Sequence, residues 1–284
     1  MKPVPPVRPM PDIFRYYLEL GTLFEEISER SGFMNFGHLE SGQKTNDVSF
    51  AQRQLIRKTA EAGKFGRGMR VLDVGCGLGG PAAQVAEEFG CEVTAMDPGP
   101  YQRIRLRSRM ADSSGESVFS AVSGDALDLP FRPGSFDRIY SVESAFHYGD
   151  KPRFVRESSR ALRRGGLVVV ADLLRKPGRG RSWLARTLEK ALAAPQVFSV
   201  EQYAKAAERT GLRLQSAEDV SPGVRRAMRL WRRNFFRKWP SFRAHYSLMT
   251  LVKIGVALTL TPALAPLAPF QYVILVFEPD ENGR

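Results

Sequence analysis

From residue 70 onward, short apolar runs alternate with longer stretches in which apolar residues recur at helical spacing. The apolar runs predict five strands, at 70–75, 91–97, 117–125, 136–144 and 167–174. The stretches between them predict three helices, at 80–89, 100–112 and 151–163. This repeated order of strand and helix is typical of a parallel, doubly wound α/β sheet, and a continuous run such as LVVV suits a strand buried on both faces.

Further elements are expected on both sides of this region. The apolar pattern predicts helices at 13–30 and 48–63 upstream, with a Gly-rich break between them. Downstream it predicts a helix at 199–210, a strand at 212–220, helical structure over 221–245 and a last strand at 271–279. We therefore expect four parts: an N-terminal arm and helical cap (1–65), a core (66–220), a helical lid (221–269) and a last core strand with a tail (270–284).

Residues 247–268 form an apolar segment whose length approaches that of a membrane-spanning helix. Lys253 and the prolines Pro262, Pro266 and Pro269 argue against a span, and a strong strand pattern follows directly. We expect a helix of the lid or of a substrate tunnel, with a helix lying on a membrane surface as the alternative.

The net charge of +12 is unevenly spread, because residues 221–245 hold eight Arg or Lys and no Asp or Glu. A basic face attracts nucleic acid, anionic lipid or a phosphorylated substrate, or is simply solvated. No zinc-finger or RNP-type signature supports nucleic acid. Cys76 and Cys91 form neither a disulfide framework nor a CxxC metal site, and the proline-rich start lacks the apolar region of a signal peptide. We expect a cytoplasmic protein without a metal site.

The stretch VLDVGCGLGG (71–80) ends the first predicted core strand and opens a helix. Its glycines let the backbone turn tightly and approach a ligand, and the N–H groups at the helix start favour an anionic group. A dinucleotide fits such a loop, but Asp73 would repel a pyrophosphate. The same carboxylate favours a cationic ammonium group, which points to S-adenosylmethionine.

Two more acids follow later strands. Asp97 ends the second strand about twenty residues after the loop, where a carboxylate can accept hydrogen bonds from both ribose hydroxyls. Asp125 follows the third strand in GDALDLPF, where it can accept from an adenine amino group.

At this point the chain resembles the class I S-adenosylmethionine-dependent methyltransferases. VLDVGCGLGG, AMD, GDALDLPFRPGSFDRIYSVES and ALRRGGLVVVADL match the successive motifs of that family in order, over about residues 66–175. NFGH (35–38) and EQYAKAAERTGLRLQSAEDVSP further resemble its small-molecule subgroup, which includes sugar O-methyltransferases of macrolide and indolocarbazole pathways and sterol, tocopherol and prenyl diphosphate C-methyltransferases. The resemblance implies a Rossmann-like seven-stranded core with a helical cap and lid.

The resemblance also implies roles for residues that match the family motifs. It places Asp73, Gly75 and Gly77 on the methionine-binding loop, Asp97 at the ribose with Gln102 nearby, Asp125 and Ala126 at the adenine, and Ser141 and Glu143 beside the methionine moiety and the substrate entrance.

The acceptor chemistry is expected at ESAFHY (143–148), where O-methylating members of the subgroup often read ESLHH. His147 matches the second histidine and is a candidate general base, Asp172 is a candidate partner that orients it, and Glu143 is a third candidate catalytic group. Phe146 replaces the first histidine and makes the site more aromatic. A passive role of His147 in the pocket wall remains the alternative.

These features predict a methyltransferase whose acceptor is a hydrophobic small molecule, a natural product or an isoprenoid. O-methylation with His147 as the base is favoured slightly over C-methylation of an isoprenoid or prenyl diphosphate, with or without carbocation rearrangement. The aromatic and basic lid further suggests a peripheral membrane contact through 225–268. A nucleic-acid-binding methyltransferase-like protein and a non-catalytic S-adenosylmethionine-binding module are the rivals, although nucleic-acid methyltransferase motifs of the N/D-P-P-Y/F type are absent.

Overall fold

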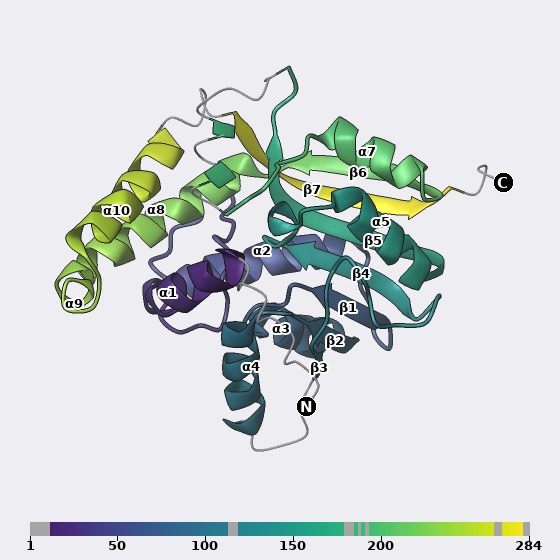
Figure 1. Ribbon diagram of the computed structural model, residues 1–284, viewed down its shortest axis with the longest axis horizontal. Helices are drawn as coiled ribbons and strands as arrows, with labels where there is room; N and C mark the ends of the chain where they lie inside the picture. The colour runs from purple at the N-terminus through teal and green to yellow at the C-terminus, as the bar shows by residue number, and fades with distance from the viewer. Residues whose placement is uncertain are drawn as a thin grey trace, which may run out of the picture.

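A computed structural model describes residues 12–112, 119–178, 185–186, 189–190, 193–263 and 269–280. Seven strands form one sheet in the order β3-β2-β1-β4-β5-β7-β6 (Figure 1). The strands are β1 (Arg70–Val74), β2 (Glu92–Met96), β3 (Phe119–Val122), β4 (Phe136–Val142), β5 (Leu162–Arg175), β6 (Leu212–Asp219) and β7 (Phe270–Pro279). The helices are α1 (Asp12–Ile27), α2 (Val48–Ala62), α3 (Gly80–Phe89), α4 (Pro100–Asp112), the 3-10 helix η1 (Ala145–His147), α5 (Lys151–Ala161), α7 (Val200–Glu208), α8 (Ser221–Arg237), α9 (Trp239–Phe242) and α10 (Leu248–Ala263).

Helices cover both faces of the sheet. Val71 of β1 packs in one apolar cluster with residues of α2 and α3, whereas Leu72 and Val74 pack in a second cluster with α5 and α7. Successive side chains of a strand point to opposite faces, so continuous apolar runs are expected where both faces are buried. The predicted α/β, Rossmann-like fold class is confirmed.

The last strand runs in the opposite direction to the other six, a direction that the sequence pattern did not predict. β7 pairs antiparallel with both β5 and β6, and the other neighbouring strands pair parallel. Helices α8, α9 and α10 follow the carboxyl end of β6 (Figure 1). Because the chain enters β7 from that same edge, β7 has to run back through the sheet in the opposite direction.

Several element ends differ from the predicted ones for local reasons. The first helix ends at Ile27, and Glu29 and Arg30 then adopt left-handed φ angles of 57° and 55°. β4 ends at Val142 because Glu143 has a φ of 48°. A non-glycine residue in this region is strained, and such positions often lie at functional sites.

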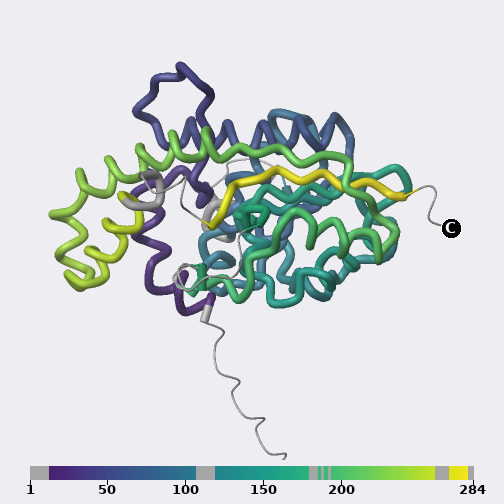
Figure 2. Tube along the Cα trace, turned by 90° about the horizontal axis from the view of Figure 1, so that it is seen from above, coloured from purple at the N-terminus to yellow at the C-terminus, as the bar shows by residue number. Residues whose placement is uncertain are grey.

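The segment between β6 and β7 forms an arm of helices beside the sheet. Figure 2 shows α8 and α10 reaching past the sheet, with α1 next to them. Trp231 and Phe235 of α8 pack with Leu23 of α1 and Leu251 of α10 in a third apolar cluster. The division of the chain into cap, core and lid stays a prediction. No helix among the described residues has the length and apolarity that crossing a membrane requires.

The predicted NFGH element lies against α2. Gly37 has a φ of 91°, and a Cβ atom there would lie 2.6 Å from the Ala51 carbonyl carbon and 2.7 Å from its oxygen. The N–H of His38 donates to the same Ala51 oxygen at 2.8 Å. Close backbone approach and a left-handed turn both require glycine at this position.

Gly37→Ala is therefore expected to destabilise the fold more than Gly42→Ala. Gly42 has a similar φ of 83°, but a Cβ there would meet no heavy atom within 4 Å. Both variants carry the cost of about 1–2 kcal/mol for a left-handed alanine, and only Gly37→Ala adds a backbone clash. Urea unfolding of the two variants measures the difference. Equal free energies of unfolding would contradict the close packing of Gly37 against α2.

Candidate functional site

A cavity of about 1160 Å³ lies at the carboxyl ends of β1, β2 and β4. One part of it is lined by the loop after β1, the start of α4 and the start of the β3–β4 connection. The other part is lined by α1, α8 and α10. Of the predicted site residues, eight line this cavity: Gly75, Gly77, Asp97, Gln102, Asp125, Ala126, Glu143 and His147. Asp73, Ser141 and Asp172 do not line it and lie behind its wall.

The glycine loop is held close to two neighbouring elements. The N–H groups of Gly75 and Cys76 donate to the Met96 carbonyl at 2.8 and 3.1 Å, which ties the loop to β2. Gly75 has a φ of 78°, and a Cβ there would lie 1.9 Å from the Ser144 hydroxyl. Above Gly77 the nearest side-chain atom, the Met34 sulfur, would lie 3.9 Å from an added Cβ, so this backbone is open to a ligand.

Asp97 joins the loops that follow β1 and β2. Its carboxylate accepts the N–H of Gly77 at 3.2 Å and that of Gly99 at 2.8 Å. Burial nevertheless raises the pKa of Asp97 to about 6, since these two donors offset only part of the desolvation. A ligand with hydroxyl donors would favour the ionised form.

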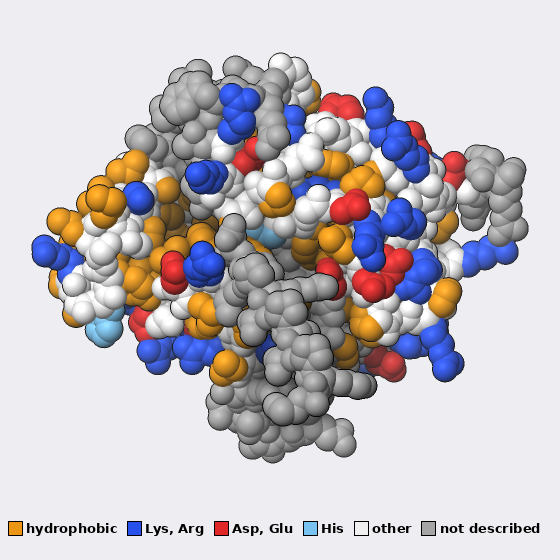
Figure 3. Space-filling view, in the orientation of Figure 1, with side chains coloured by type: hydrophobic (Ala, Val, Ile, Leu, Met, Phe, Trp, Pro, Cys, Tyr) orange, Lys and Arg blue, Asp and Glu red, His pale blue; other side chains and the backbone are white. Residues whose placement is uncertain are grey.

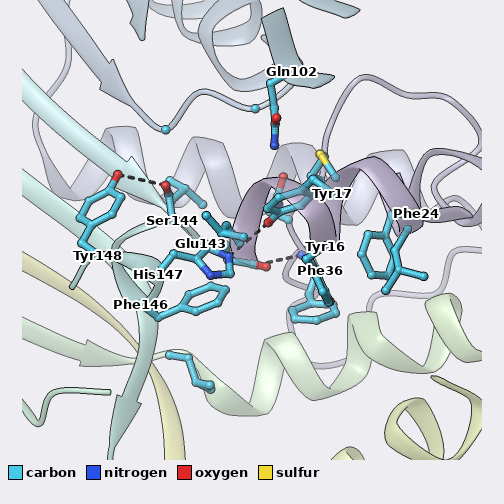
Figure 4. Close-up of a pocket in the computed structure, with 18 of the residues that line it drawn as sticks. Tyr16, Tyr17, Phe24, Phe36, Gln102, Glu143, Ser144, Phe146, His147 and Tyr148 are labelled. Carbon is cyan, nitrogen blue, oxygen red and sulfur yellow. Dashed lines mark hydrogen bonds between the residues drawn. The ribbon is translucent and has the colours of Figure 1, made fainter. Parts of the chain in front are cut away.

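Gln102 and the Asp125–Ala126 pair lie at the same end of the cavity. The Oε1 atom of Gln102 is buried and has no hydrogen-bond partner among the described residues. Figure 4 shows the Gln102 side chain pointing toward the other labelled cavity residues. Asp125 Oδ1 accepts the N–H of Leu127 at 2.9 Å, which fixes the turn that presents Ala126 to the cavity. Oriented acceptors beside an open glycine loop fit a nucleoside carrying an ammonium group.

Asp73 and Ser141 support the loop from beneath. The Tyr140 hydroxyl donates to Asp73 at 2.8 Å, and burial raises the pKa of this carboxyl to about 7. Ser141 is fully buried, with its hydroxyl 3.4 Å from that of Tyr148. A cation bound above Asp73 would stabilise its ionised form electrostatically, because the glycines place no side chain between the two charges.

Glu143 connects three separate segments of the chain. Its Oε1 atom accepts the N–H of Phe36 at 2.8 Å and lies 3.1 Å from the hydroxyl of Tyr272 at the start of β7. Burial raises the pKa of Glu143 to about 8. The left-handed turn after β4 aims this carboxyl group into the cavity, where a positively charged ligand would ionise it.

His147 projects from η1 into the centre of the cavity (Figure 4). Its Nδ1 atom lies 3.2 Å from the Ala193 carbonyl oxygen, and its Nε2 atom lies 3.2 Å from the Tyr17 hydroxyl. Because a carbonyl only accepts, this contact is a hydrogen bond when Nδ1 carries the proton, which leaves Nε2 as an acceptor for Tyr17. Burial lowers the pKa of His147 to about 4, so the ring is neutral at pH 7.

Asp172 makes contacts other than the predicted hydrogen bond to His147. Its two oxygens accept the N–H groups of Phe146 and Leu173, each at 2.7 Å. Lys151, also buried, donates to the Tyr148 carbonyl at 2.9 Å, just after η1. Burial raises the pKa of Asp172 and lowers that of Lys151. Asp172 therefore holds the backbone of η1, whereas the Ala193 carbonyl orients the imidazole.

Several cavity residues had little or no signal in the sequence. Tyr17 lies in the predicted helical cap and Trp231 in the predicted lid, where its ring packs edge-on against that of Phe36 with the ring centroids 5.6 Å apart. Ala193 contributes its backbone carbonyl, and because every residue has one, the sequence could not predict this contact. His38 of the NFGH element bonds to Glu40 at 2.9 Å and does not line the cavity. In the part of the chain that the structure describes, no three His, Cys, Asp or Glu side chains form a metal-ligand group.

Comparison with known proteins shows similarity to methyltransferases. Residues 72–170 match the family described as a methyltransferase domain. An O-methyltransferase, rstn1, from Aspergillus nomiae is 25% identical over 207 residues, which are 71% of this chain and 92% of that protein. The 2-methyl-6-phytyl-1,4-hydroquinone methyltransferase of Synechocystis is 34% identical over 188 residues, 63% of this chain and 58% of that protein.

Among solved structures, the chain is similar to geranyl diphosphate C-methyltransferase from Streptomyces coelicolor, in complex with Mg²⁺, geranyl diphosphate and S-adenosyl-L-homocysteine. The TM-score is 0.73 at 20% identity, covering 98% of this chain and all of that one. This likeness concerns the fold.

The pKa of Asp97 leads to a test of the cofactor end of the cavity. Donors of the ligand favour the ionised carboxyl, so ionisation of Asp97 is expected to raise the affinity for S-adenosylmethionine as pH rises through about 6, and Asp73 and Glu143 extend this rise to higher pH. Below pH 6 the dissociation constant should increase by up to about tenfold per pH unit. Titration calorimetry between pH 5 and 8 measures this. Asp97→Asn is expected to bind more weakly at pH 8 with a shallower pH profile, and a pH-independent wild-type affinity would contradict the role of Asp97.

Proposed function

We propose that this chain, which belongs to the S-adenosylmethionine-dependent methyltransferases, methylates a hydroxyl group of a hydrophobic small molecule with His147 as the general base. The observation that carries the proposal is the contact of the Tyr17 hydroxyl with Nε2 of His147 at 3.2 Å. It places a phenolic hydroxyl on the unprotonated ring nitrogen, inside the cavity that the glycine loop also lines. An acceptor hydroxyl in the same position would have a base within hydrogen-bond reach.

The cavity wall supports a hydrophobic acceptor. Apart from Glu143 and His147, the part near α1 and α8 is lined mainly by aromatic and aliphatic side chains: Tyr16, Tyr17, Leu20, Phe24, Phe36, Phe146, Met228 and Trp231. Such a surface binds apolar area and excludes water from the reacting groups. The similar proteins named for O-methylation and for a phytyl hydroquinone are consistent with an acceptor of this kind.

The low pKa of His147 narrows the class of hydroxyl. The pKa of an aliphatic alcohol lies far above that of a base with a pKa of about 4, which makes proton transfer to this base unfavourable. The pKa of a phenol or hydroquinone is lower, so such a hydroxyl gives up its proton more easily. The proposal is therefore an aromatic hydroxyl on an apolar body. The Tyr17 phenol, itself in contact with Nε2, is a model of such a group within the chain.

In the proposed reaction the cofactor supplies an electrophilic methyl group. The chain contributes the rest: Asp97, Gln102 and the glycine loop hold the nucleoside end, and the aromatic wall orients the acceptor. Nε2 of His147 takes the proton that the hydroxyl loses. The Ala193 carbonyl, which accepts from Nδ1, stabilises the imidazolium that results.

C-methylation is the second candidate, and Glu143 favours it. A half-buried carboxyl group with a pKa raised to about 8 becomes ionised when positive charge develops nearby, and it can then accept a proton from a cationic intermediate. Aromatic faces such as Phe36 and Trp231 also stabilise a cation. An alkene acceptor would use these groups in place of His147.

Substitution of His147 separates the two candidates. His147→Ala is expected to lower kcat for a phenolic acceptor by about 100- to 10,000-fold, the range for loss of a general base, with S-adenosylmethionine affinity unchanged. Tyr17→Phe is the matched control, because it removes only the hydroxyl that contacts Nε2 and should retain kcat within about threefold. Steady-state kinetics and calorimetry measure both. Full turnover in His147→Ala would assign His147 to the pocket wall.

The pH dependence of kcat provides an independent check. His147 is ready to accept a proton only when neutral, and with a pKa lowered to about 4 it stays neutral throughout the range from pH 6 to 8. At saturating cofactor and acceptor, kcat is therefore expected to be flat across this range. A kcat that falls by about tenfold per pH unit below pH 6.5 would show a histidine of ordinary basicity. It would contradict a ring that stays neutral down to a pKa of about 4.

A further inference from the structure

One face of α10 exposes a row of large apolar side chains. Leu248, Met249, Val252 and Val256 are 54%, 67%, 47% and 49% exposed. Residues 248, 252 and 256 are four positions apart and so share one face of the helix. Leu251 and Leu258, on the other face, are buried against α8 and its neighbours. Figure 3 shows apolar side chains gathered over this helix at the left of the molecule.

The chain segment that contains this face carries no acidic side chain. Residues 221–277 contain nine Lys or Arg and no Asp or Glu. Arg237 and Lys238 pair with Glu29 and Glu26 of the α1 region. Arg232, Arg243 and Lys253 are exposed and form no ion pair within the described residues. An apolar face flanked by cations fits a layer whose interior is apolar and whose outer surface carries negative charge.

The same helix borders the acceptor part of the cavity. Thr250, Lys253, Ile254 and Val256 of α10 line it together with Arg225 and Met228 of α8. Val256 therefore belongs both to the exposed row and to the cavity wall. A molecule that leaves a layer touching α10 would enter the cavity without crossing bulk water.

We infer that the exposed face of α10 docks on an anionic lipid bilayer, from which the enzyme takes its hydrophobic acceptor; the second half of this inference rests on the proposed function. A helix of sixteen residues with an apolar row and flanking cations suits a position in the plane of the interface. The cations add attraction to anionic lipids, which falls as salt rises. The occupant is a bilayer rather than a second copy of the chain, because pairing two such faces would bring like charges together.

Vesicle co-sedimentation tests the docking without any acceptor. Wild-type protein is expected to bind vesicles of phosphatidylcholine mixed with phosphatidylglycerol at low salt. Compared with this binding, its affinity should fall at least tenfold in 0.5 M salt. It should also fall at least tenfold for vesicles of phosphatidylcholine alone. The double variant Met249→Asp/Val252→Asp should bind at least tenfold more weakly than wild type. Neither residue lines the cavity. Ile104→Asp is the matched control, since Ile104 is an exposed apolar residue of α4 (65%) and its substitution should leave vesicle binding unchanged.

Two further measurements separate docking from catalysis. The affinity of the double variant for S-adenosylmethionine and its turnover of a detergent-solubilised phenol are expected to equal those of wild type. Equal vesicle binding by wild type and the double variant would overturn the inference. So would absence of wild-type binding, or concentration-dependent dimerisation that the double variant abolishes. If the vesicle results are as expected but neither wild type nor the double variant turns over the phenol, the result would count against the proposed function alone.

Discussion

The carboxyl end of β4 is the constraint on which the site depends. The chain leaves the strand through a left-handed Glu143, whose half-buried carboxyl group accepts hydrogen bonds from the Phe36 N–H and the Tyr272 hydroxyl. This single side chain joins the NFGH segment, β4 and β7 at the cavity. Four residues later comes His147, and the backbone next to it is held by Asp172, which accepts from the Phe146 N–H, and by Lys151, which donates to the Tyr148 carbonyl. The backbone strain at Glu143 is thus offset by contacts that also shape this wall of the cavity.

Burial has opposite consequences for the acids and for the histidine of this cavity. It raises the pKa of Asp73, Asp97 and Glu143 toward neutrality, so these groups respond strongly to a cationic or hydroxyl-bearing ligand. It lowers the pKa of His147 and keeps the ring neutral. A cavity that stabilises bound positive charge while keeping one unprotonated nitrogen suits methyl transfer to a hydroxyl.

The sequence predicted the parts of the site that depend on residue type and spacing. Glycines at fixed positions and an acid after β2 report a ligand-binding loop, and the structure places Gly75, Gly77 and Asp97 on the cavity. Contacts made by the backbone escaped prediction: the Ala193 carbonyl orients His147, and Asp172 binds N–H groups. The sequence made no prediction of the direction of β7, because periodicity is the same for parallel and antiparallel strands.

The proposal of O-methylation can be tested most directly by locating the transferred methyl group. Incubation of the protein with methyl-¹³C-labelled S-adenosylmethionine and a lipophilic phenol, followed by NMR of the product, identifies the atom that carries the label. The account predicts a ¹³C methyl resonance of an aryl methyl ether, formed by wild type and lost in His147→Ala. A label on ring or chain carbon, formed equally by both proteins, would contradict it.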